Sequence, residues 1–196
     1  MATTPIAKAR LRHKFRAELK RMPGADRHAR SLAICERIAP LIQGACTVAV
    51  FAPRPDEPDL KLLELSALWL GRTILFPKLE DSRPAFAPAE SWEELQPGPF
   101  GLLTPIRPAS SLEPQLVLVP GLAFSRQGDR LGRGAGFYDR YLAGLGTAVR
   151  TIGVAFHLQL IDELPRDAHD FQVRSVVTEL ETIHVTGVGC RVPGVE

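Results

Sequence analysis

Apolar residues near the start of the chain recur at helical spacing. Four of them lie three or four positions apart: Leu11, Phe15, Leu19 and Met22. This spacing is typical of one face of a helix, and Pro23-Gly24 supplies a stop signal. The pattern predicts an amphipathic helix over residues 7–22. A second helix is expected from about residue 27 to 42, with four side chains facing inward: Leu32, Cys35, Ile38 and Ile42.

Short β-branched and apolar runs then predict strands, separated by helical or loop segments. The expected strands are 47–52, 73–76, 116–119, 151–156, 173–178 and 182–185. Asp59 is a plausible N-cap for a helix that runs to Leu70, and residues 137–145 predict another helix. Strands that alternate with helices indicate an α/β fold with a mostly parallel sheet and helices on both faces.

The polar segments that carry chemistry each follow a predicted strand. These segments are Ala52–Glu57, Lys78 and Arg130–Asp139. Ligands of open α/β sheets bind beyond the carboxyl ends of the strands, so we expect the three segments along one edge. Residues 80–115 are rich in proline and predict an irregular region folded over the sheet, because their aromatic side chains need burial.

The length of 196 residues favours one domain, expected over residues 1–186, followed by a loose tail over 187–196. The net charge of +2 is too small to indicate a nucleic-acid partner. The chain contains no apolar run of about 20 residues, so no membrane partner is expected. The first eight residues lack the apolar stretch of a signal peptide. Three cysteines without a Cys-x-x-Cys pair predict reduced thiols and a cytoplasmic protein: Cys35, Cys46 and Cys190.

Three glycines at every second position stand between a predicted strand and a predicted helix. They are Gly132, Gly134 and Gly136, flanked by Arg130 and Arg133. Glycines let the backbone approach a ligand closely, successive N–H groups form an anion-binding concavity, and arginine forks suit phosphate oxygens. The segment therefore predicts a polyphosphate site. The spacing matches neither a dinucleotide fold nor a P-loop, so a plain glycine-rich turn stays open on spacing alone.

A longer match extends this pattern. Val119–Phe124, followed by Arg130-Leu-Gly-Arg-Gly-Ala-Gly-Phe-Tyr-Asp139, resembles the signature of the 5-formyltetrahydrofolate cyclo-ligase family. The resemblance covers most of the chain, from Lys8 to Glu179. It implies a fold related to sugar-phosphate isomerases and CoA transferases. It also implies an ATP-dependent conversion of 5-formyltetrahydrofolate, a reduced folate, to 5,10-methenyltetrahydrofolate with release of ADP and phosphate, and it implies no protein partner.

The resemblance also implies roles for individual residues. ATP contacts are expected from Lys8, Arg12, Arg130, Leu131, Gly132, Arg133, Gly134, Ala135, Gly136, Phe137 and Tyr138. Lys8 and Arg12 are four residues apart and share one helix face, although solvated surface charges would show the same spacing. Arg133 and Asp139 are the expected catalytic residues. Asp139 is also the expected Mg²⁺ ligand.

Folate contacts are expected from Ala52, Glu57, Phe100 and Gln159. The Glu57 carboxylate would accept two adjacent N–H bonds from the pterin ring, and Gln159 would order the site through its amide. A solvated loop position for Glu57 and a core position for Phe100 remain open. Asp56 is expected in solvent or in a capping role. His169-Asp170 is expected to form a structural turn, and no zinc role is expected for His157.

Some positions depart from the family pattern. Phe137 replaces a common tyrosine, Thr104-Pro105 replaces Glu-Pro, and Arg174 stands where an acidic residue is implied to help hold Mg²⁺. Two alternatives therefore stay open. One is an ATP- and folate-binding paralogue with weak or absent catalysis, which Phe137 and Arg174 favour. The other is a sugar-phosphate- or CoA-binding enzyme of the same fold class, against which Glu57 argues.

Overall fold

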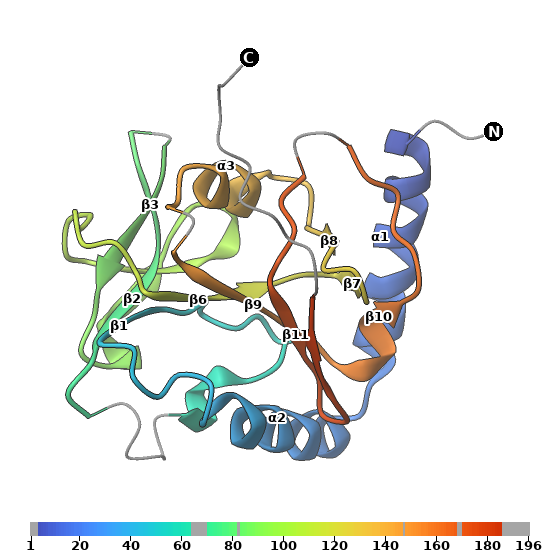
Figure 1. The fold of residues 1–196 in the computed structure, drawn as a ribbon, viewed down its shortest axis with the longest axis horizontal. Helices are drawn as coiled ribbons and strands as arrows, with labels where there is room; N and C mark the ends of the chain where they lie inside the picture. The colour runs from blue at the N-terminus through green and yellow to red at the C-terminus, as the bar shows by residue number, and fades with distance from the viewer. Residues whose placement is uncertain (1–3, 64–69, 82, 147, 168–169, 186–196) are drawn as a thin grey trace.

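A seven-stranded sheet forms the centre of the computed structural model, which describes residues 4–185 except 64–69, 82, 147 and 168–169 (Figure 1). The strand order is β12-β11-β9-β6-β1-β2-β3. The strands are β1 (Thr47–Ala49), β2 (Thr73–Glu80), β3 (Arg83–Pro88), β6 (Leu116–Pro120), β9 (Arg150–Val154), β11 (Ser175–Val177) and β12 (Thr182–His184). The five inner strands pair in parallel, whereas β3 and β12 pair antiparallel at the two edges. The prediction of a mostly parallel sheet is confirmed.

The middle of the sheet is fully apolar. The side chains from Leu116 to Val119 in β6 have no exposed surface, as expected for a parallel strand covered on both faces. They belong to one hydrophobic cluster that extends from Phe15 to Val177. This cluster makes the sheet a rigid base for the loops at its edge.

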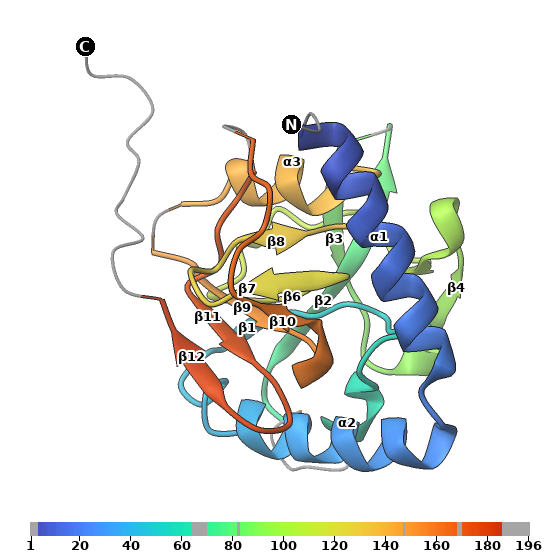
Figure 2. The same ribbon diagram turned by 90° about the vertical axis from the view of Figure 1, so that its right-hand side faces the viewer.

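The α-helices of the described residues surround the sheet. α2 (Gly24–Ile38) lies against one face and α3 (Phe137–Ala143) lies on the other. α1 (Thr4–Arg21) crosses the carboxyl ends of the inner strands (Figure 2). The predicted α1 face is confirmed, since Phe15, Leu19 and Met22 are buried.

The predicted inner face of α2 is confirmed for Cys35 and Ile38 and wrong for Leu32, and the predicted end is also wrong. Leu32 is 44% exposed, and Ser31 and Ile34 are buried instead. Positions 31, 34, 35 and 38 share one face of the helix, and position 32 lies outside that face. The helix ends at Ile38, because Pro40 has no backbone N–H to continue the hydrogen-bond ladder.

Residues 80–115 are more regular than expected. β3 joins the main sheet beside β2, after a turn in which Asp81 has a φ of 48°. Its prolines, Pro84 and Pro88, are compatible with an edge strand, which need not donate from every backbone nitrogen. β4 (Leu95–Pro97) and β5 (Leu103–Pro105) form a separate hairpin. The expectation of an irregular region was therefore wrong for these strands.

Smaller elements complete the fold. β7 (Ala123–Ser125), β8 (Arg130–Leu131) and β10 (Leu160–Ile161) form a three-stranded sheet. Short 3-10 helices are η1 (Leu60–Leu63), η3 (Trp92–Glu94), η4 (Pro99–Gly101) and η5 (His157–Gln159). The helix expected from Asp59 to Leu70 begins with η1, and Leu70 lies in a turn, whereas residues 64–69 between them lie outside the described part. The expected tail over 187–196 lies outside it.

Two further observations concern the described residues only. No helix among them is long and apolar enough to span a membrane. Cys35 is buried and Cys46 is exposed, and both are free thiols.

Candidate active site

Two adjoining pockets lie at the carboxyl edge of the sheet, where β1 and β6 end. Ala52 and Glu57 follow β1, and Gly121 follows β6. Residues 132–136, called here the glycine loop, lie between β8 and α3 and contribute to both pockets. The expectation that the segments after β1 and after β8 meet at one edge is confirmed. Lys78 instead binds the backbone carbonyls of Pro105, Ile106 and Arg107 and lines neither pocket in the described part of the chain.

The glycine loop is held by α1. Arg12 donates from Nε to the carbonyl of Gly132 at 3.0 Å, and Arg16 donates from Nη2 to the carbonyl of Arg133 at 2.9 Å. Gly134 has a φ of 109° and Gly136 a φ of 64°. Both values lie in the region that side chains disfavour, so glycine is required for this path of the backbone.

The smaller pocket, called here the inner pocket, has a volume of about 90 Å³. Its walls are largely apolar and include Phe51, Ala52, Leu102, Phe137 and Tyr138. The Tyr138 hydroxyl is buried and has no hydrogen-bond partner among the described residues. Burial raises the pKa of this hydroxyl, so it remains an O–H donor. The inner pocket therefore combines aromatic surface with an unsatisfied donor.

A buried ion-pair cluster closes one side of the inner pocket. Glu57 is only 5% exposed. Its Oε1 accepts from Nε of Arg133 at 2.9 Å, and its Oε2 accepts from the backbone N–H of Arg54 at 3.0 Å. Arg133 also donates from Nη2 to Asp56 at 2.7 Å. Burial raises the pKa of the Glu57 carboxyl, and the neighbouring Arg133 cation opposes that change.

The larger pocket, called here the outer pocket, has a volume of about 380 Å³ and mostly polar walls. Lys8 and Arg12 of α1 line it, together with Arg140, Asp167 and Asp170. The Lys8 ammonium bridges two carboxylates, with Asp167 at 2.7 Å and Asp170 also in contact. This arrangement of several cations around an open volume suits an anionic ligand.

Four residues line both pockets: Arg130, Gly132, Gly136 and Asp139. The buried Arg130 donates from Nη2 to Asp139 at 2.6 Å and from Nη1 to the carbonyl of Pro120 at 3.2 Å. Its guanidinium carbon lies 5.7 Å from the centre of the Tyr138 ring. The wall between the pockets is thus built around one fixed arginine–carboxylate pair.

Comparison with known proteins adds to this geometry. The model of the 5-formyltetrahydrofolate cyclo-ligase family matches residues 5–179. The chain belongs to this family. The 5-formyltetrahydrofolate cyclo-ligase of Mycolicibacterium smegmatis is 32% identical over 184 residues, covering 89% of this chain and 95% of the relative. The mouse (Mus musculus) 5-formyltetrahydrofolate cyclo-ligase is 26% identical and covers 90% and 96%, respectively.

A solved structure supports the same relationship. The 5,10-methenyltetrahydrofolate synthetase of Aquifex aeolicus is 28% identical, with a TM-score of 0.80 over 96% of each chain. A synthetase from Mycoplasma pneumoniae, at 20% identity, shares the fold with a TM-score of 0.71. The resemblance predicted from the signature is therefore confirmed at the level of the family.

The residues expected to bind ATP in this cyclo-ligase divide between the pockets. Those that line the outer pocket are Lys8, Arg12, Arg130, Leu131, Gly132, Gly134 and Gly136. Four others line only the inner pocket: Arg133, Ala135, Phe137 and Tyr138. Asp139, the expected catalytic residue and Mg²⁺ ligand, lines both pockets.

The expected folate residues are only partly brought together. Ala52 and Glu57 line the inner pocket, so a solvated position for Glu57 is excluded. Gln159 is buried beneath the site. Its amide donates to the carbonyls of Gly121 and Leu122 and accepts from the N–H of Phe156. This supports an ordering role rather than direct contact. Phe100 belongs to η4, and its side chain lies outside the described part of the structure.

Sequence reasoning missed three carboxylates. Asp56 was expected in solvent but pairs with Arg133. Asp167 and Asp170 were not assigned to the site, yet both hold Lys8. The His169-Asp170 motif was a usable signal for Asp170, although it was interpreted as a turn. Asp167 has no local signal, because its partner lies 159 positions away in the sequence.

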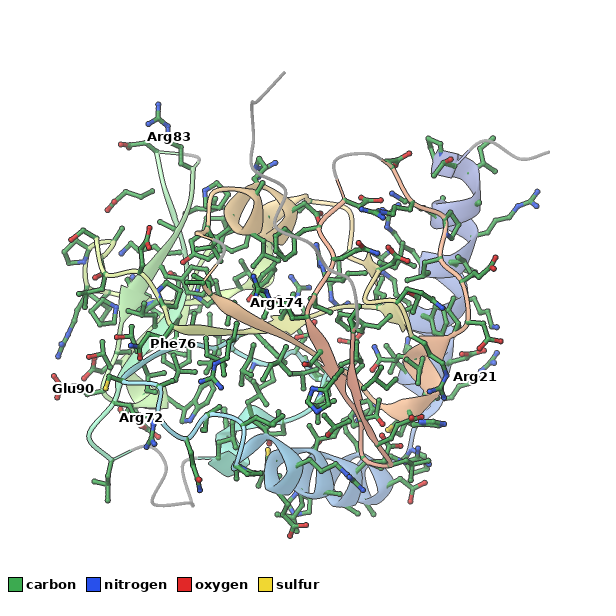
Figure 3. All side chains as sticks on the ribbon, viewed as in Figure 1. Arg21, Arg72, Phe76, Arg83, Glu90 and Arg174 are labelled. Atoms are coloured by element: carbon green, nitrogen blue, oxygen red, sulfur yellow. The ribbon has the colours of Figure 1, made fainter. Side chains whose placement is uncertain are left out.

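Arg174 lies away from both pockets. Its backbone N–H donates to the carbonyl of Thr151 at the start of β9, and it immediately precedes β11 (Figure 3). The pockets lie at the opposite, carboxyl ends of these parallel strands. Arg174 lines neither pocket as the described residues form them. The charge change at position 174 therefore gives no argument against a functional site.

Proposed function

We propose that this cyclo-ligase converts 5-formyltetrahydrofolate to 5,10-methenyltetrahydrofolate with cleavage of ATP and release of ADP and phosphate. One observation carries the proposal: a charged pocket and a largely apolar pocket share the wall formed by Arg130, Gly132, Gly136 and Asp139. Transfer of a group between two ligands requires their reacting atoms to meet in a fixed orientation. A common wall provides such a meeting point.

ATP is assigned to the outer pocket. Lys8, Arg12 and Arg130 would neutralise phosphate charge, and the backbone N–H groups of the glycine loop would donate to phosphate oxygens. The transition state of phosphoryl transfer spreads negative charge over several oxygens. Positioned cations therefore supply most of the catalysis that the protein can provide.

The reduced folate is assigned to the inner pocket. Glu57 would accept the paired N–H groups of the pterin, and Phe137 and Tyr138 would contact the ring. The buried Tyr138 hydroxyl, which has no partner in the described part of the chain, would donate to a ligand oxygen. The substrate would then present its formyl group towards the shared wall.

The chemistry follows from the poor electrophilicity of a formyl amide. The formyl oxygen attacks the γ-phosphorus, an O–P bond forms, and the bond to the ADP oxygen breaks. The N10 amine then attacks the formyl carbon and closes the ring. The N10 proton is lost, and phosphate departs with the former formyl oxygen. Arg130 and the loop N–H groups stabilise the negative charge that develops on phosphate.

Asp139 is the proposed ligand of Mg²⁺. Its carboxylate lines the outer pocket with about a quarter of the side chain exposed. Among the described residues, no cluster of three or more histidines, cysteines or carboxylates forms a metal cage. Such a cage is not required, since Mg²⁺ binds nucleotides through one or two carboxylates, phosphates and water. When bound, the ion would neutralise phosphate charge.

The direct test mixes purified protein with ATP, Mg²⁺ and 5-formyltetrahydrofolate. We expect methenyl absorbance to rise together with ADP in a one-to-one ratio. Binding of both ligands without ADP release would instead indicate the non-catalytic paralogue. Of its two supporting substitutions, Arg174 lies outside the pockets and only Phe137 remains in the inner one. Thermal stabilisation by sugar phosphates but not by folates would favour the sugar-phosphate enzyme.

Three broader assignments are also proposed. A fold related to sugar-phosphate isomerases and CoA transferases accords with a site beyond the carboxyl ends of parallel strands. A single domain over residues 1–186 accords with one continuous hydrophobic cluster, and one cooperative unfolding transition would test it. A cytoplasmic location accords with the free thiols Cys35 and Cys46, and cell fractionation would test it.

A further inference from the structure

Arg133 lies between a residue shared by the two pockets and a residue of the outer pocket. Gly132 lines both pockets and Gly134 lines the outer pocket, whereas the Arg133 side chain lines only the inner pocket. The guanidinium is held there by Glu57 at 2.9 Å and Asp56 at 2.7 Å. The side chain is 22% exposed. Arg133 therefore lies at the boundary of the outer pocket, but its guanidinium is paired with carboxylates in the inner pocket.

This pairing conflicts with the proposed role of Glu57. Oε1 of Glu57 accepts from Arg133, and Oε2 accepts from the Arg54 backbone. Each carboxylate oxygen has two acceptor positions. The paired N–H groups of the pterin would need one position on each oxygen, and the Arg133 guanidinium occupies one on Oε1. The inner pocket is also small, at about 90 Å³, compared with roughly 300–1,000 Å³ for typical ligand pockets. The ion pair thus occupies the feature that a folate would use.

The backbone around Arg133 permits the side chain to change sides. Glycines flank it, and Gly134 has a φ of 109°, a conformation that only glycine adopts readily. The loop is tied to α1 through carbonyls, by Arg12 at Gly132 and by Arg16 at Arg133. These bonds fix the backbone without holding the Arg133 guanidinium. A rotation of the side chain can therefore occur while the loop stays attached.

We propose that Arg133 couples the two pockets: a folate displaces its guanidinium from Glu57, and the guanidinium then binds the terminal phosphate of ATP in the outer pocket. This inference rests on the proposed function and adds a dependence of each ligand's binding on the other ligand. A folate in the inner pocket makes it easier for the arginine to reach the phosphate. ATP in the outer pocket in turn favours the displaced arginine and opens Glu57 to the folate.

The pairing of charges predicts positive coupling, in which each ligand strengthens the binding of the other. Arg133 cannot pair with Glu57 and with a phosphate in the same position. When folate binds alone, the displaced Arg133 guanidinium has weaker partners than before. When ATP binds alone, its phosphate must compete with the carboxylates of Glu57 and Asp56 for this guanidinium. When both ligands are present, the carboxylate and the cation each have a partner. Thermodynamic linkage requires the effect to be reciprocal, with typical coupling of about 5–150-fold.

The test measures binding with the non-hydrolysable analogue AMP-PNP and Mg²⁺. The dissociation constant of 5-formyltetrahydrofolate is determined with and without saturating AMP-PNP, and the reverse experiment is done with saturating folate. For the wild type we expect each ligand to tighten the other by about fivefold or more, and by the same factor. Binding of both ligands with a coupling factor of one would overturn this inference alone. Absence of folate binding would overturn the proposed function and the inference together.

Two variants locate the coupling. For Arg133→Gln we expect the factor to fall to about one, because the neutral amide no longer pairs strongly with either partner. Arg83→Gln is the matched control, since Arg83 is exposed at the end of the β2–β3 hairpin (Figure 3). It should keep the wild-type factor. Wild-type coupling in Arg133→Gln would show that Arg133 is a fixed wall residue and would refute the inference.

Asp56→Asn provides a second, milder change. It removes one of the two carboxylates that hold Arg133 in the inner pocket. We expect AMP-PNP to bind more tightly in the absence of folate and the coupling factor to decrease. Weaker or unchanged AMP-PNP binding by a folded Asp56→Asn variant would contradict the proposed competition between Asp56 and phosphate.

Discussion

The inner and outer pockets hold their charges in different ways. In the inner pocket, one buried carboxylate, Glu57, lies among largely apolar walls and is satisfied by individual hydrogen bonds. In the outer pocket, several cations and carboxylates surround a larger open volume. A buried polar group that loses a hydrogen bond without replacement costs free energy, so it favours a ligand that restores the bond. Within the described part of the chain, the outer pocket has four cations and three carboxylates, and its excess of positive charge favours an anion. The inner pocket is therefore suited to selecting the substrate, and the outer pocket to binding phosphate.

Two arginines show the same contrast. Arg130 is buried and held by a carboxylate, a backbone carbonyl and an aromatic ring. Arg133, with glycine on either side, is held only through side-chain carboxylates and a carbonyl contact of its own backbone. The first arginine is part of a fixed wall, and the second is placed to move between pockets. Substitutions should separate these roles.

The largest effect is expected for Arg130→Gln, since Arg130 belongs to both pockets. Breaking a buried ion pair costs about 3–5 kcal/mol, so we expect a lower melting temperature, weaker binding of both ligands and a rate reduced by about 100-fold or more. Thermal unfolding and methenyl formation would measure these changes. The control is Arg126→Gln, at an exposed pair with Glu181. Loss of affinity for only one ligand would show that Arg130 is not a shared wall.

Glu57→Gln should weaken folate binding in the inner pocket. A hydrogen bond to a charged group contributes about 1.5–3 kcal/mol, so folate affinity should fall by about tenfold or more. ATP affinity without folate should not fall and should rise moderately, because Arg133 loses one of its two carboxylate partners. Equilibrium binding of each ligand separately would measure this. Glu90→Gln, at an exposed carboxylate, should leave both affinities unchanged. An unaltered folate dissociation constant in Glu57→Gln would remove this residue from the folate site.

Lys8→Gln is the corresponding change in the outer pocket. Its effect should be smaller, about fivefold on the KM for ATP, because Lys8 is already paired with Asp167 and Asp170 and its net gain on binding phosphate is reduced. The KM for folate should not change. Lys14→Gln on the same helix is the control, since that side chain is 59% exposed. A larger effect on folate than on ATP would reverse the assignment of the two pockets.

Acid should weaken folate binding through Glu57. Burial raises the pKa of this carboxyl, so it is protonated at a higher pH than an ordinary glutamate and then loses one acceptor position. The charged or titratable groups around it are Arg133, Asp56 and Tyr138. Folate affinity should decline as the pH falls towards the raised pKa. The contribution of Glu57 to the folding free energy depends on pH in the opposite direction from its contribution to folate binding. Because the pKa is higher in the folded state, Glu57 stabilises the fold fully at a pH below its pKa in the unfolded chain. This stabilisation is lost as the pH rises through the pKa in the folded state.

The measurement is a pH series of folate dissociation constants for the wild type and Glu57→Gln. The slope attributed to Glu57 should disappear in the variant. An identical pH dependence in both proteins would assign the effect to another group.

The smallest effect is expected at Arg174. The family resemblance suggested that an acidic residue at this position helps to hold Mg²⁺. The structure places Arg174 at the amino ends of β9 and β11, away from the outer pocket. Arg174→Asp should therefore leave the Mg²⁺ concentration for half-maximal rate unchanged. A lower requirement in the variant would restore position 174 to the metal site and show that the pocket assignment is incomplete.

Much of the fold was predictable because its signals are local. The β-branched run before Pro120 and the spacing of Phe15 and Leu19 each reflect the burial of one face of one element. The exposed Leu32 and the strand β3 were predicted wrongly. Leu32 was assigned inward by its apolar side chain, but the buried face of α2 passes through Ser31 instead. An edge strand tolerates the prolines that suggested a loop.

The sequence by itself determined the family, the positions along the chain of six of the seven described strands of the main sheet, and the presence of a glycine loop with two arginines at the edge of the sheet. Only the tertiary structure decided which pocket each arginine faces. Arg133 is flanked by glycines, so its own segment permits either side. The choice depends on Asp56 and Glu57, which lie 77 and 76 positions away in the sequence. Electrostatic pairing across such a separation exists only once β1 and the glycine loop have been brought together by the packed sheet.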